Sequence, residues 1–255
     1  MNLSPTLSAV IITFNEEKNI ERCLDSLDGL VDEIIVVDSF STDATKEMCL
    51  RKGVQFVEHP FEGHIEQKNY AASLAQSDYI LSLDADEALT EGLRHEIEVI
   101  KPKLSGEAYS LPRLTNYCGK WIAHCGWYPD RKIRLWKKGT GNWGGKNPHD
   151  RMILEPNTPL KELKNDLLHY SFYTVQQHLK QISFFTDISS QAAFESGKKS
   201  SLVKILFNPF FKFIRDYILL RGFLDGYYGL IICLNSAFAK YLKYLKLREL
   251  NKANN

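Results

Sequence analysis

The first third of the chain alternates between apolar, β-branched runs and segments with helical spacing. The apolar runs cover residues 9–13, 33–38, 54–57 and 79–84. Between the first two runs, the spacing i, i+3, i+4 and i+7 of a buried helix face recurs at Ile20, Cys23, Leu24 and Leu27. Further helices are expected after the N-cap residues Ser41 or Asp43, and around 65–75. Strands alternating with helices predict an α/β fold with a mixed, mainly parallel sheet.

The rest of the chain changes character twice. Residues 105–168 contain short apolar pieces, many glycines and many aromatic residues, which predict strands and long loops that carry function. A three/four spacing then predicts a helix over 171–196. Residues 201–248 are rich in Phe, Leu, Tyr and Lys and predict further helices, interrupted at Asn208–Pro209 and near Gly222, Gly226 and Gly229.

The net charge of the whole chain conceals two parts of opposite charge. The net charge is only +1, which argues against a nucleic-acid binder organised around bulk positive charge. Residues 1–197 hold 21 Lys/Arg and 28 Asp/Glu, a net charge of −7, whereas residues 198–255 hold 11 and 3, a net charge of +8. The last quarter of the chain therefore presents a different kind of surface.

Cysteine usage and the N-terminus bear on the compartment. The five cysteines include no CxxC pair, so neither a disulfide framework nor a zinc knuckle is indicated. The N-terminus lacks a basic stretch followed by an apolar one, so we expect a cytoplasmic protein. The apolar stretch 223–238 is too short to cross a bilayer, and no membrane span is expected.

Polar residues follow three of the predicted strands at their C-terminal ends. They are Thr13–Glu16, Asp38–Ser39 and Asp84–Asp86. In an open α/β sheet this edge binds ligands, although each group alone also fits a helix cap or a strand end. Two carboxylates emerging together at Asp84 and Asp86 repel each other unless a cation is present. Mg²⁺ or Mn²⁺ would offset that repulsion and hold a diphosphate.

Other phosphate-binding motifs fit less well. The first strand is not followed by GxGxxG, and the chain has no GxxxxGK[ST] loop. A phosphohydrolase of the haloacid dehalogenase type also places DxD after a strand, but its motif continues to Thr or Val where this chain has Ala88. That class also leaves Asp38 unexplained.

Four segments in order resemble the nucleotide-sugar half of family 2 glycosyltransferases. They are SAVIITFNEE (8–17), VVDSFSTDAT (36–45), QKNYA (67–71) and LDADE (83–87). Three later segments, 126–136, 148–151 and 168–171, resemble the subgroup of bacterial lipopolysaccharide-core β-glucosyltransferases. One departure is Ser39–Phe40, where the family usually has Asp/Asn-Gly or Gly-Gly. The resemblance implies a GT-A fold that holds one metal-bound nucleotide-sugar at the sheet edge.

The resemblance also implies roles for individual residues at the donor site. The nucleoside pocket would be lined by Thr13, Asn15 and Glu16, and Asp38 would accept a hydrogen bond from a uracil-like base. Asp43 would order the loop, and Lys68 would lie near the ribose or diphosphate unless it is a solvated helix lysine. Asp84 would contact the ribose or sugar. Arg131 and Arg134 would steady the departing diphosphate through bidentate contacts.

Metal ligands and a catalytic base follow from the same resemblance. Asp86 would ligate the metal directly, and His169 is the favoured further ligand, the alternative being a capping or packing role. Sugar transfer with inversion needs a base for the acceptor hydroxyl. Asp150 is the first candidate, because related enzymes carry His-Glu or His-Asp at this place, although it would alternatively pair with Arg151 or Arg134. Asp130 is the second candidate for the base, and Glu87 is the third.

The basic C-terminal region has two interpretations. Lysines and arginines interleaved with Phe, Tyr and Leu over 201–248 fit an anionic membrane surface, and they fit equally a helical packing or dimer surface. A lipid-linked acceptor favours the membrane, which would place a cytoplasmic protein peripherally on the inner face of the cytoplasmic membrane.

The sequence as a whole predicts a glycosyltransferase domain over 1–197 and an amphipathic helical region over 198–255. Within the first, 1–104 would form the nucleotide-sugar half and 105–197 the acceptor half. The expected reaction is metal-dependent, inverting transfer of a hexose from a UDP-sugar to a cell-envelope glycan or lipid-linked saccharide. The alternatives are a phosphohydrolase with Asp84 as nucleophile and a non-catalytic nucleotide-sugar-binding protein at the membrane.

Overall fold

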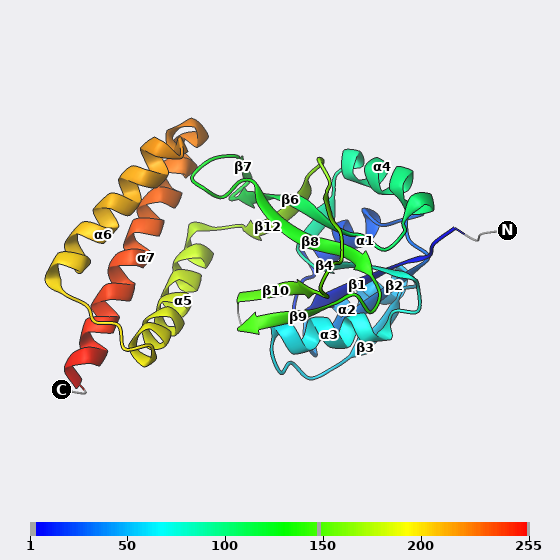
Figure 1. The fold of residues 1–255 in the computed structure, drawn as a ribbon, viewed down its shortest axis with the longest axis horizontal. Coiled ribbons are helices and arrows are strands. Elements are labelled where there is room, and N and C mark those ends of the chain that lie inside the picture. The colour runs from blue at the N-terminus through cyan, green and yellow to red at the C-terminus, as the bar shows by residue number, and fades with distance from the viewer. Residues whose placement is uncertain (1–3, 147–148, 254–255) are drawn as a thin grey trace. The chain divides into compact units, whose positions relative to one another are not determined.

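The computed structural model describes residues 4–146 and 149–253 (Figure 1). Its contacts group the chain into two compact units. The first unit comprises Met1–Arg113 and Asp130–Tyr170, and the second comprises Leu114–Pro129 and Ser171–Asn255. The second unit thus combines the C-terminal helices with a segment from the middle of the chain. The sequence placed a boundary after residue 197, and this division into 1–197 and 198–255 stays a prediction.

Four parallel strands form the N-terminal half of the main sheet, as the sequence predicts. Their order is β3 (Gln55–Glu58), β2 (Glu33–Asp38), β1 (Leu7–Thr13) and β4 (Tyr79–Asp84). Helices connect them, namely α1 (Ile20–Asp25), α2 (Thr45–Arg51) and α3 (His64–Leu74). Such β-branched runs with intervening amphipathic helices fold into βαβ units because both faces of a parallel sheet must be buried.

Side chains of successive strand residues separate the core into two layers. Ala9 and Ile11 of β1 pack with Ile20 and Leu24 of the first helix on one face of the sheet. Val10, between them, packs on the other face with residues of β2 and α3. This alternation is the expected consequence of the two-residue period of a strand. The predicted helix face around Ile20 is therefore buried as expected.

An antiparallel half completes the mixed sheet. Beyond β4 the order continues with β8 (Asp130–Lys137), β6 (Ala108–Tyr117), β12 (Leu167–Phe172) and β5 (Glu87–Leu89). The short strands β7 (Lys120–Ile122) and β11 (Leu160–Glu162) also pair with β6. A separate hairpin is formed by β9 (Gly141–Lys146) and β10 (His149–Leu154). The predicted mixed α/β sheet flanked by helices is confirmed, and its middle region consists of strands and loops as expected.

Three elements of the first unit escaped prediction, namely the strand β5 and two helices. The helix α4 (Glu91–Ile100) begins at Thr90, whose hydroxyl accepts a hydrogen bond from Leu93 N, and the short helix η1 (Lys101–Lys103) follows it. The buried residues of α4 are Leu93 and Ile97, which are spaced by about one helical turn. This short apolar stripe lies among charged residues and gives a weak sequence signal.

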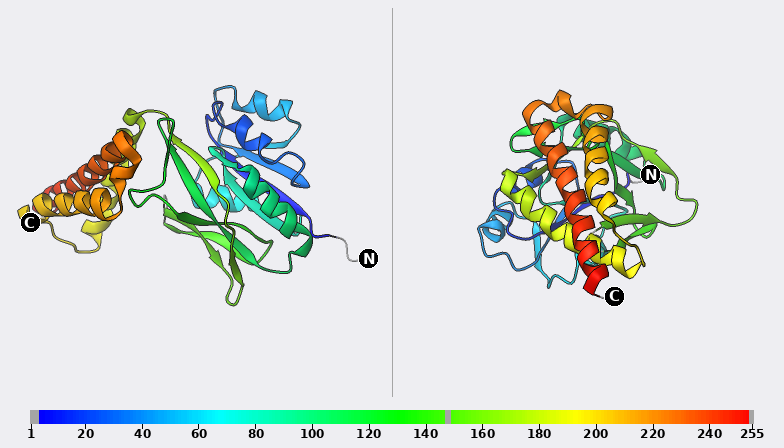
Figure 2. Two further views of the ribbon diagram at one scale, coloured as in Figure 1. Left: turned by 90° about the horizontal axis from the view of Figure 1, so that it is seen from above. Right: turned by 90° about the vertical axis from the view of Figure 1, so that its left-hand side faces the viewer.

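The second unit is mainly helical. It contains α5 (Val175–Glu195), α6 (Leu202–Ile214), the short π-helical η2 (Arg215–Leu219), η3 (Gly222–Asp225) and α7 (Gly226–Ala253). Figure 2 shows α5 and α6 beside α7, and both helices contact it. Thr174 and Gln177 form a capping box at the start of α5, which explains why the helix begins later than the predicted residue 171.

The helical breaks agree only in part with those expected. The sequence predicted an interruption at Asn208–Pro209, but α6 continues through Pro209. The break expected near Gly222 and Gly226 is present, because the chain turns at Arg221, whose φ is 55°, and at Gly226, whose φ is 64°. Gly229 lies inside α7, where a Cβ atom would come within 2.0 Å of the Gly222 carbonyl oxygen. Gly229 therefore permits a close chain approach and does not interrupt the helix, contrary to the expectation.

No single helix in the described ranges has the length and hydropathy of a membrane span. Leu202–Leu219 and Gly222–Ala253 meet those criteria only as a pair, which is bent by 70°.

Candidate active site

The strand register gathers the polar strand ends of the first unit at one edge of the sheet. Thr13 at the end of β1 lies opposite Asp38 of β2, and Ile12 lies opposite Asp84 of β4. Thr13 is buried, and its hydroxyl has no hydrogen-bond partner within the described residues. The edge thus offers a free hydroxyl between two carboxylate-bearing strand ends.

Asp38 and Asn15 join the loops that follow β1 and β2. The buried carboxylate of Asp38 accepts hydrogen bonds from the backbone N–H and the hydroxyl of Ser41. The Ser41 hydroxyl in turn accepts from Asn15 N at 2.8 Å, and Asn15 Oδ1 accepts from Thr42 N at 2.8 Å. These predicted nucleoside contacts thus also order the loops, although carboxylate oxygens retain capacity for another donor.

Asp43 fixes the next part of the same loop. Its carboxylate accepts from Glu17 N at 3.1 Å, and from the backbone and hydroxyl of Thr45. Burial would raise the pKa of Asp43, but the hydrogen bonds from Thr45 lower it below its usual range. Phe40, half of the departure noted in the sequence, adopts a φ of 61°, in the left-handed region that favours glycine.

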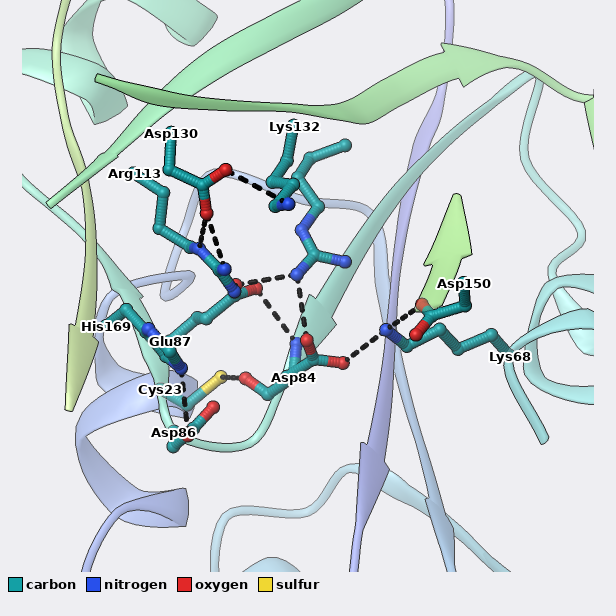
Figure 3. Close-up of polar contacts among 11 residues, drawn as sticks. Cys23, Lys68, Asp84, Asp86, Glu87, Arg113, Asp130, Lys132, Asp150 and His169 are labelled. Atoms are coloured by element: carbon teal, nitrogen blue, oxygen red, sulfur yellow. Dashed lines mark hydrogen bonds and ion pairs between the residues drawn. The ribbon is translucent and has the colours of Figure 1, made fainter. Parts of the chain in front are cut away.

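A chain of buried ion pairs runs from Asp84 in two directions (Figure 3). Asp84 Oδ1 lies 2.9 Å from Lys68 Nζ, and Asp84 Oδ2 lies 2.8 Å from Arg134 Nη2. Lys68 Nζ also lies 2.8 Å from Asp150 Oδ2. The Lys68 side chain is only 5% exposed. The structure therefore contradicts a solvated lysine and brings Asp84, Lys68, Asp150 and Arg134 together.

Glu87 continues this chain of ion pairs beyond Arg134. Its fully buried carboxylate lies 2.6 Å from Arg134 Nη2 and 3.1 Å from Arg113 Nη1. Arg113 continues to Asp130 at 2.6 Å, and Lys132 lies 3.0 Å from the same aspartate. Four carboxylates and four cations therefore alternate from Asp150 to Lys132. Arg113 was not predicted from the sequence, because no motif marks it and only the strand pairing of β6 with β8 brings it here.

These ion pairs lower the pKa of two of the carboxylates, Asp84 and Asp130. Burial would raise the pKa of Asp84, but Lys68 and Arg134 hold it well below its usual range. Burial also opposes ionisation of Asp130, but Arg113 lowers its pKa. Asp130 and Glu87, the second and third candidates for a base, are thus engaged by two cations each. Neither is well placed to accept a proton.

The two arginines of β8 have different surroundings. The pairing of β6 with β8 shifts between Tyr109 and Ser110, whose partners are Leu135 and Ile133, so Arg134 is the extra residue of a β-bulge. Bulges redirect side chains, and Arg134 reaches Asp84. Arg131 instead donates to the Leu163 carbonyl at 3.0 Å and lies 3.4 Å from Glu162. The structure therefore brings Arg134, but not Arg131, into the ion-pair chain.

The β9–β10 hairpin is fastened to α3 beside this chain. Asn69 donates to the Trp143 carbonyl and accepts from Trp143 N, each at 2.9 Å. Lys68 Nζ lies 4.5 Å from the centre of the Trp143 ring. The buried indole N–H of Trp143 and the Nε of Arg134 have no hydrogen-bond partner in the described part of the chain. These two unused donors suit a ligand rich in oxygen atoms.

Asp86 and His169 meet on the other side of the Asp-Ala-Asp turn. Antiparallel pairing of β5 with β12 sets His169 opposite Glu87, and the Tyr170 N–H donates to the Asp86 carbonyl at 2.8 Å. His169 Nε2 consequently lies 3.3 Å from Asp86 Oδ2. Both side chains are partly exposed. One carboxylate oxygen and one imidazole nitrogen fit a divalent ion that takes its remaining ligands from a diphosphate and water.

The described residues contain no group of three or more His, Cys, Asp or Glu side chains placed to hold a metal ion. The protein alone therefore supplies two candidate ligands here, not a complete cage.

The raised pKa of Glu16 indicates burial and an excess of negative charge near this turn. Burial is the main cause that raises its pKa to about 7, and the carboxylates of Asp86, Asp43 and Asp84 add to the increase. A hydrogen bond from Asn19 Nδ2 to Glu16 Oε2, at 2.7 Å, opposes it. A bound cation would relieve this repulsion. Glu16 thus supports the cation expected from the paired carboxylates.

Comparison with known proteins adds family information to this geometry. Residues 8–107 match the family described as Glycosyl transferase family 2. An uncharacterized glycosyltransferase of Rickettsia felis is 30% identical, over 95% of this chain and 89% of that protein. The lipopolysaccharide core biosynthesis glycosyltransferase LpsC of Rhizobium meliloti is 26% identical, over 95% of this chain and 94% of that protein.

A solved structure also matches part of the chain. It is glucosyl-3-phosphoglycerate synthase from Mycobacterium tuberculosis, in complex with Mn²⁺, UDP and glucosyl-3-phosphoglycerate. It is 30% identical, covers 45% of either chain and superposes with a TM-score of 0.34.

Proposed function

The chain belongs to glycosyl transferase family 2, and on that premise we propose that it transfers a hexose from a UDP-sugar, with inversion and with the help of a divalent metal ion. The acceptor is a glycan or lipid-linked saccharide of the cell envelope. The observation that carries this proposal is the shared position of Lys68, between the strand-end carboxylate of Asp84 and the hairpin carboxylate of Asp150. It joins a donor-binding edge to a candidate base.

The donor would occupy the edge formed by β1, β2 and β4. Thr13 and Asp38 offer a hydroxyl and a carboxylate to the base, and Asp84 offers an acceptor to the ribose or sugar. Lys68, Arg134 and the Trp143 indole N–H offer donors to phosphate and sugar oxygens. Asn15, Glu16 and Asp43 hold the loops around the nucleoside.

Asp86 and His169 would hold Mg²⁺ or Mn²⁺. The ion, when bound, neutralises charge that develops on the departing diphosphate. Lys68 and Arg134 would add positive charge to the same group, and the partly exposed Asp86–His169 pair leaves room for diphosphate oxygens. Arg131 would contribute less directly, because its guanidinium is engaged with Leu163 and Glu162.

Asp150 would act as the general base. It takes the proton of the acceptor hydroxyl as that oxygen bonds to the anomeric carbon, and the bond from that carbon to the diphosphate breaks on the opposite face. Diphosphate oxygens compete for the Lys68 ammonium, so donor binding weakens the Lys68–Asp150 pair and frees the carboxylate. Asp130 remains bound to Arg113 and Lys132 and is therefore the weaker candidate.

The acceptor proposal draws on the relative LpsC, whose name refers to lipopolysaccharide core biosynthesis and whose similarity extends over nearly the whole chain. A lipid-linked acceptor also suits the basic helical region 201–248 as an anionic membrane surface. We accordingly place the enzyme in the cytoplasm, at the inner face of the cytoplasmic membrane.

A phosphohydrolase that uses Asp84 as nucleophile is less well supported. Both oxygens of Asp84 lie in ion pairs, with Lys68 and with Arg134, and their orientation is therefore already fixed. No observation favours this reaction over sugar transfer.

A donor-turnover panel tests the proposal. Purified protein is incubated with UDP-, GDP- and CMP-sugars, with and without Mn²⁺ and a glycolipid extract, and free nucleotide and glycosylated product are measured. Acceptor-dependent release of UDP, with a product of inverted anomeric configuration by NMR, is the expected result. Release of inorganic phosphate without an acceptor, or binding without turnover of any donor, would contradict it.

A further inference from the structure

The second unit presents an apolar helix face to solvent. Six side chains of α6 are each between 53% and 66% exposed. They are Leu202, Val203, Leu206, Phe207, Phe210 and Phe211. They fall in two adjacent rows with a spacing of four residues, so they lie along one side of the helix. Ile205 is the buried residue of α6. The helix α6 therefore buries one apolar residue in the unit and exposes six others to solvent. We call these six exposed residues the α6 face.

The chain that follows extends this surface. Five further large apolar side chains between η2 and the start of α7 are at least 47% exposed. They are Ile218, Leu219, Phe223, Leu224 and Tyr227. We call these five residues the turn segment. Scattered exposed apolar residues are ordinary, but these eleven large exposed apolar side chains within residues 202–227 mark an interaction surface.

Exposed charge around this surface has one sign. Lys198, Lys199, Lys204, Arg215 and Arg221 are exposed. The acidic residues of 198–248 are Asp216 and Asp225, and both are buried. Asp216 pairs with Lys212 and Arg215, and Asp225 pairs with His124. Within residues 198–248, negative charge is thus buried and the exposed charge is positive.

These properties discriminate between partners. A second copy of the chain docking through the same face would bring like charges together. An anionic membrane instead matches both features, because apolar side chains enter the acyl boundary while lysines and arginines reach lipid phosphates. The thirteen residues of α6 extend about 20 Å, less than the roughly 30 Å of a bilayer core, so the helix suits the plane of the interface.

The far half of α7 has other contacts. Lys246 Nζ donates to the Ser183 carbonyl and to the Thr186 hydroxyl, and it lies 2.6 Å from Asp187. All three partners belong to α5. This end of the 201–248 region is therefore committed to packing within the unit.

We propose that α6 and the turn segment lie in the interface of an anionic lipid membrane, with the α6 face in the acyl boundary and the surrounding cations on lipid headgroups. This inference specifies the membrane attachment within the proposed function, and it requires neither donor binding nor sugar transfer. The proposed membrane contact thus covers roughly residues 198–227, instead of the whole region 201–248 expected from the sequence.

Vesicle flotation of the full chain tests it without any substrate. The vesicles contain phosphatidylethanolamine with 30% phosphatidylglycerol, or phosphatidylcholine alone. The wild type should float with the anionic vesicles and not with the neutral ones. Phe207→Ser combined with Phe211→Ser should weaken the affinity roughly 100-fold or more, since two large apolar side chains lose their burial. Lys199→Gln or Lys204→Gln should cost about fivefold each.

Phe184→Ser provides the matched control, because Phe184 is also exposed and lies on α5 of the same unit. It should bind vesicles like the wild type. Equal binding by the Phe207/Phe211 double variant, or equal wild-type binding to neutral vesicles, would overturn the proposal. So would a lipid-free dimer in sedimentation velocity that the double variant dissociates, because the α6 face would then be a self-association surface.

A second measurement covers the case in which the double variant does not fold. Phe210→Trp places a fluorophore on the α6 face, and Phe184→Trp serves as its control. Brominated anionic lipids should quench the first more strongly than the second, whereas equal quenching would contradict the proposal. UDP release from detergent-solubilised acceptor, assayed in parallel, separates a failure of membrane binding from a failure of the proposed sugar transfer.

Discussion

Lys68 Nζ lies 2.8 Å from Asp150 Oδ2, so a side chain of α3 reaches the β9–β10 hairpin within the first unit. The same ammonium lies 2.9 Å from Asp84 at the end of β4. A single buried cation therefore balances two carboxylates to which the proposal gives different tasks, one at the donor and one at the acceptor. Any ligand that attracts this cation changes the surroundings of both.

Removing this cation should lower the stability of the fold. Lys68→Met leaves Asp84 and Asp150 without their shared partner, and we expect a loss of about 3 kcal/mol in the free energy of unfolding, the lower end for a broken buried pair. Urea denaturation measures it. Lys46→Met, which breaks the exposed pair with Glu58, should change stability by less than about 1 kcal/mol. Equal losses in the two variants would show that the buried Lys68 pairs stabilise the fold no more than an exposed ion pair does.

Asp150→Asn should separate chemistry from binding. The amide cannot take the acceptor proton, so kcat should fall by roughly 10² to 10⁴ while the KM for the donor stays nearly unchanged. Steady-state kinetics with varied donor and acceptor provide the comparison. Asp130→Asn should lower kcat far less, because that carboxylate is held by Arg113 and Lys132. The reverse ranking would transfer the role of base to Asp130.

Glu16 should make the metal-free protein less stable at higher pH. Its pKa is about 7 in the folded protein against an ordinary value of 4.5, so the unfolded chain releases this proton first. Folding therefore loses stability as the pH rises from about 4.5 to about 7, and the loss is complete above that range. Glu16→Gln should accordingly raise the Tm of EDTA-treated protein at pH 8 and leave it unchanged near pH 4. A gain of equal size at both pH values would rule out proton linkage at Glu16.

Gly229→Ala tests the close approach inside the second unit. The added Cβ would lie 2.0 Å from the Gly222 carbonyl oxygen, which belongs to the backbone and cannot simply rotate away. We expect a destabilisation of roughly 1–3 kcal/mol, measured by thermal or urea unfolding. At Gly92 the crowding atom is the side-chain oxygen of Asn165, which can move, so Gly92→Ala should be milder. A neutral Gly229→Ala would show that the two segments separate easily.

The parallel half of the fold was predictable from local pattern. The β-branched runs ending at Thr13, Asp38 and Asp84 coincide with β1, β2 and β4, because strands buried on both faces need nearly continuous apolar residues. Parallel pairing then brings their ends together without further information. The sequence thereby indicated both the edge that forms the candidate site and the carboxylates on it.

The ion-pair chain was not predictable in the same way. Arg113 and Arg134 reach Glu87 through antiparallel strand pairing and a β-bulge, and neither arginine leaves a periodic signal. The bulge also separates the surroundings of Arg131 and Arg134, which the sequence had treated alike. Likewise Pro209 remains inside α6, because packing against α7 offsets its missing hydrogen bond, which local propensity alone does not reveal.

The most direct test of the account is the linkage between metal and UDP binding at Asp86 and His169. Mn²⁺ binding is followed by electron paramagnetic resonance with and without UDP, on the wild type, Asp86→Asn and His169→Ala, with His95→Ala as a surface control. We expect UDP to tighten Mn²⁺ binding in the wild type and the control, and to have little effect in the two site variants. UDP binding that is equally tight in EDTA, or Mn²⁺ binding that survives both substitutions, would contradict a metal-dependent donor site at this turn.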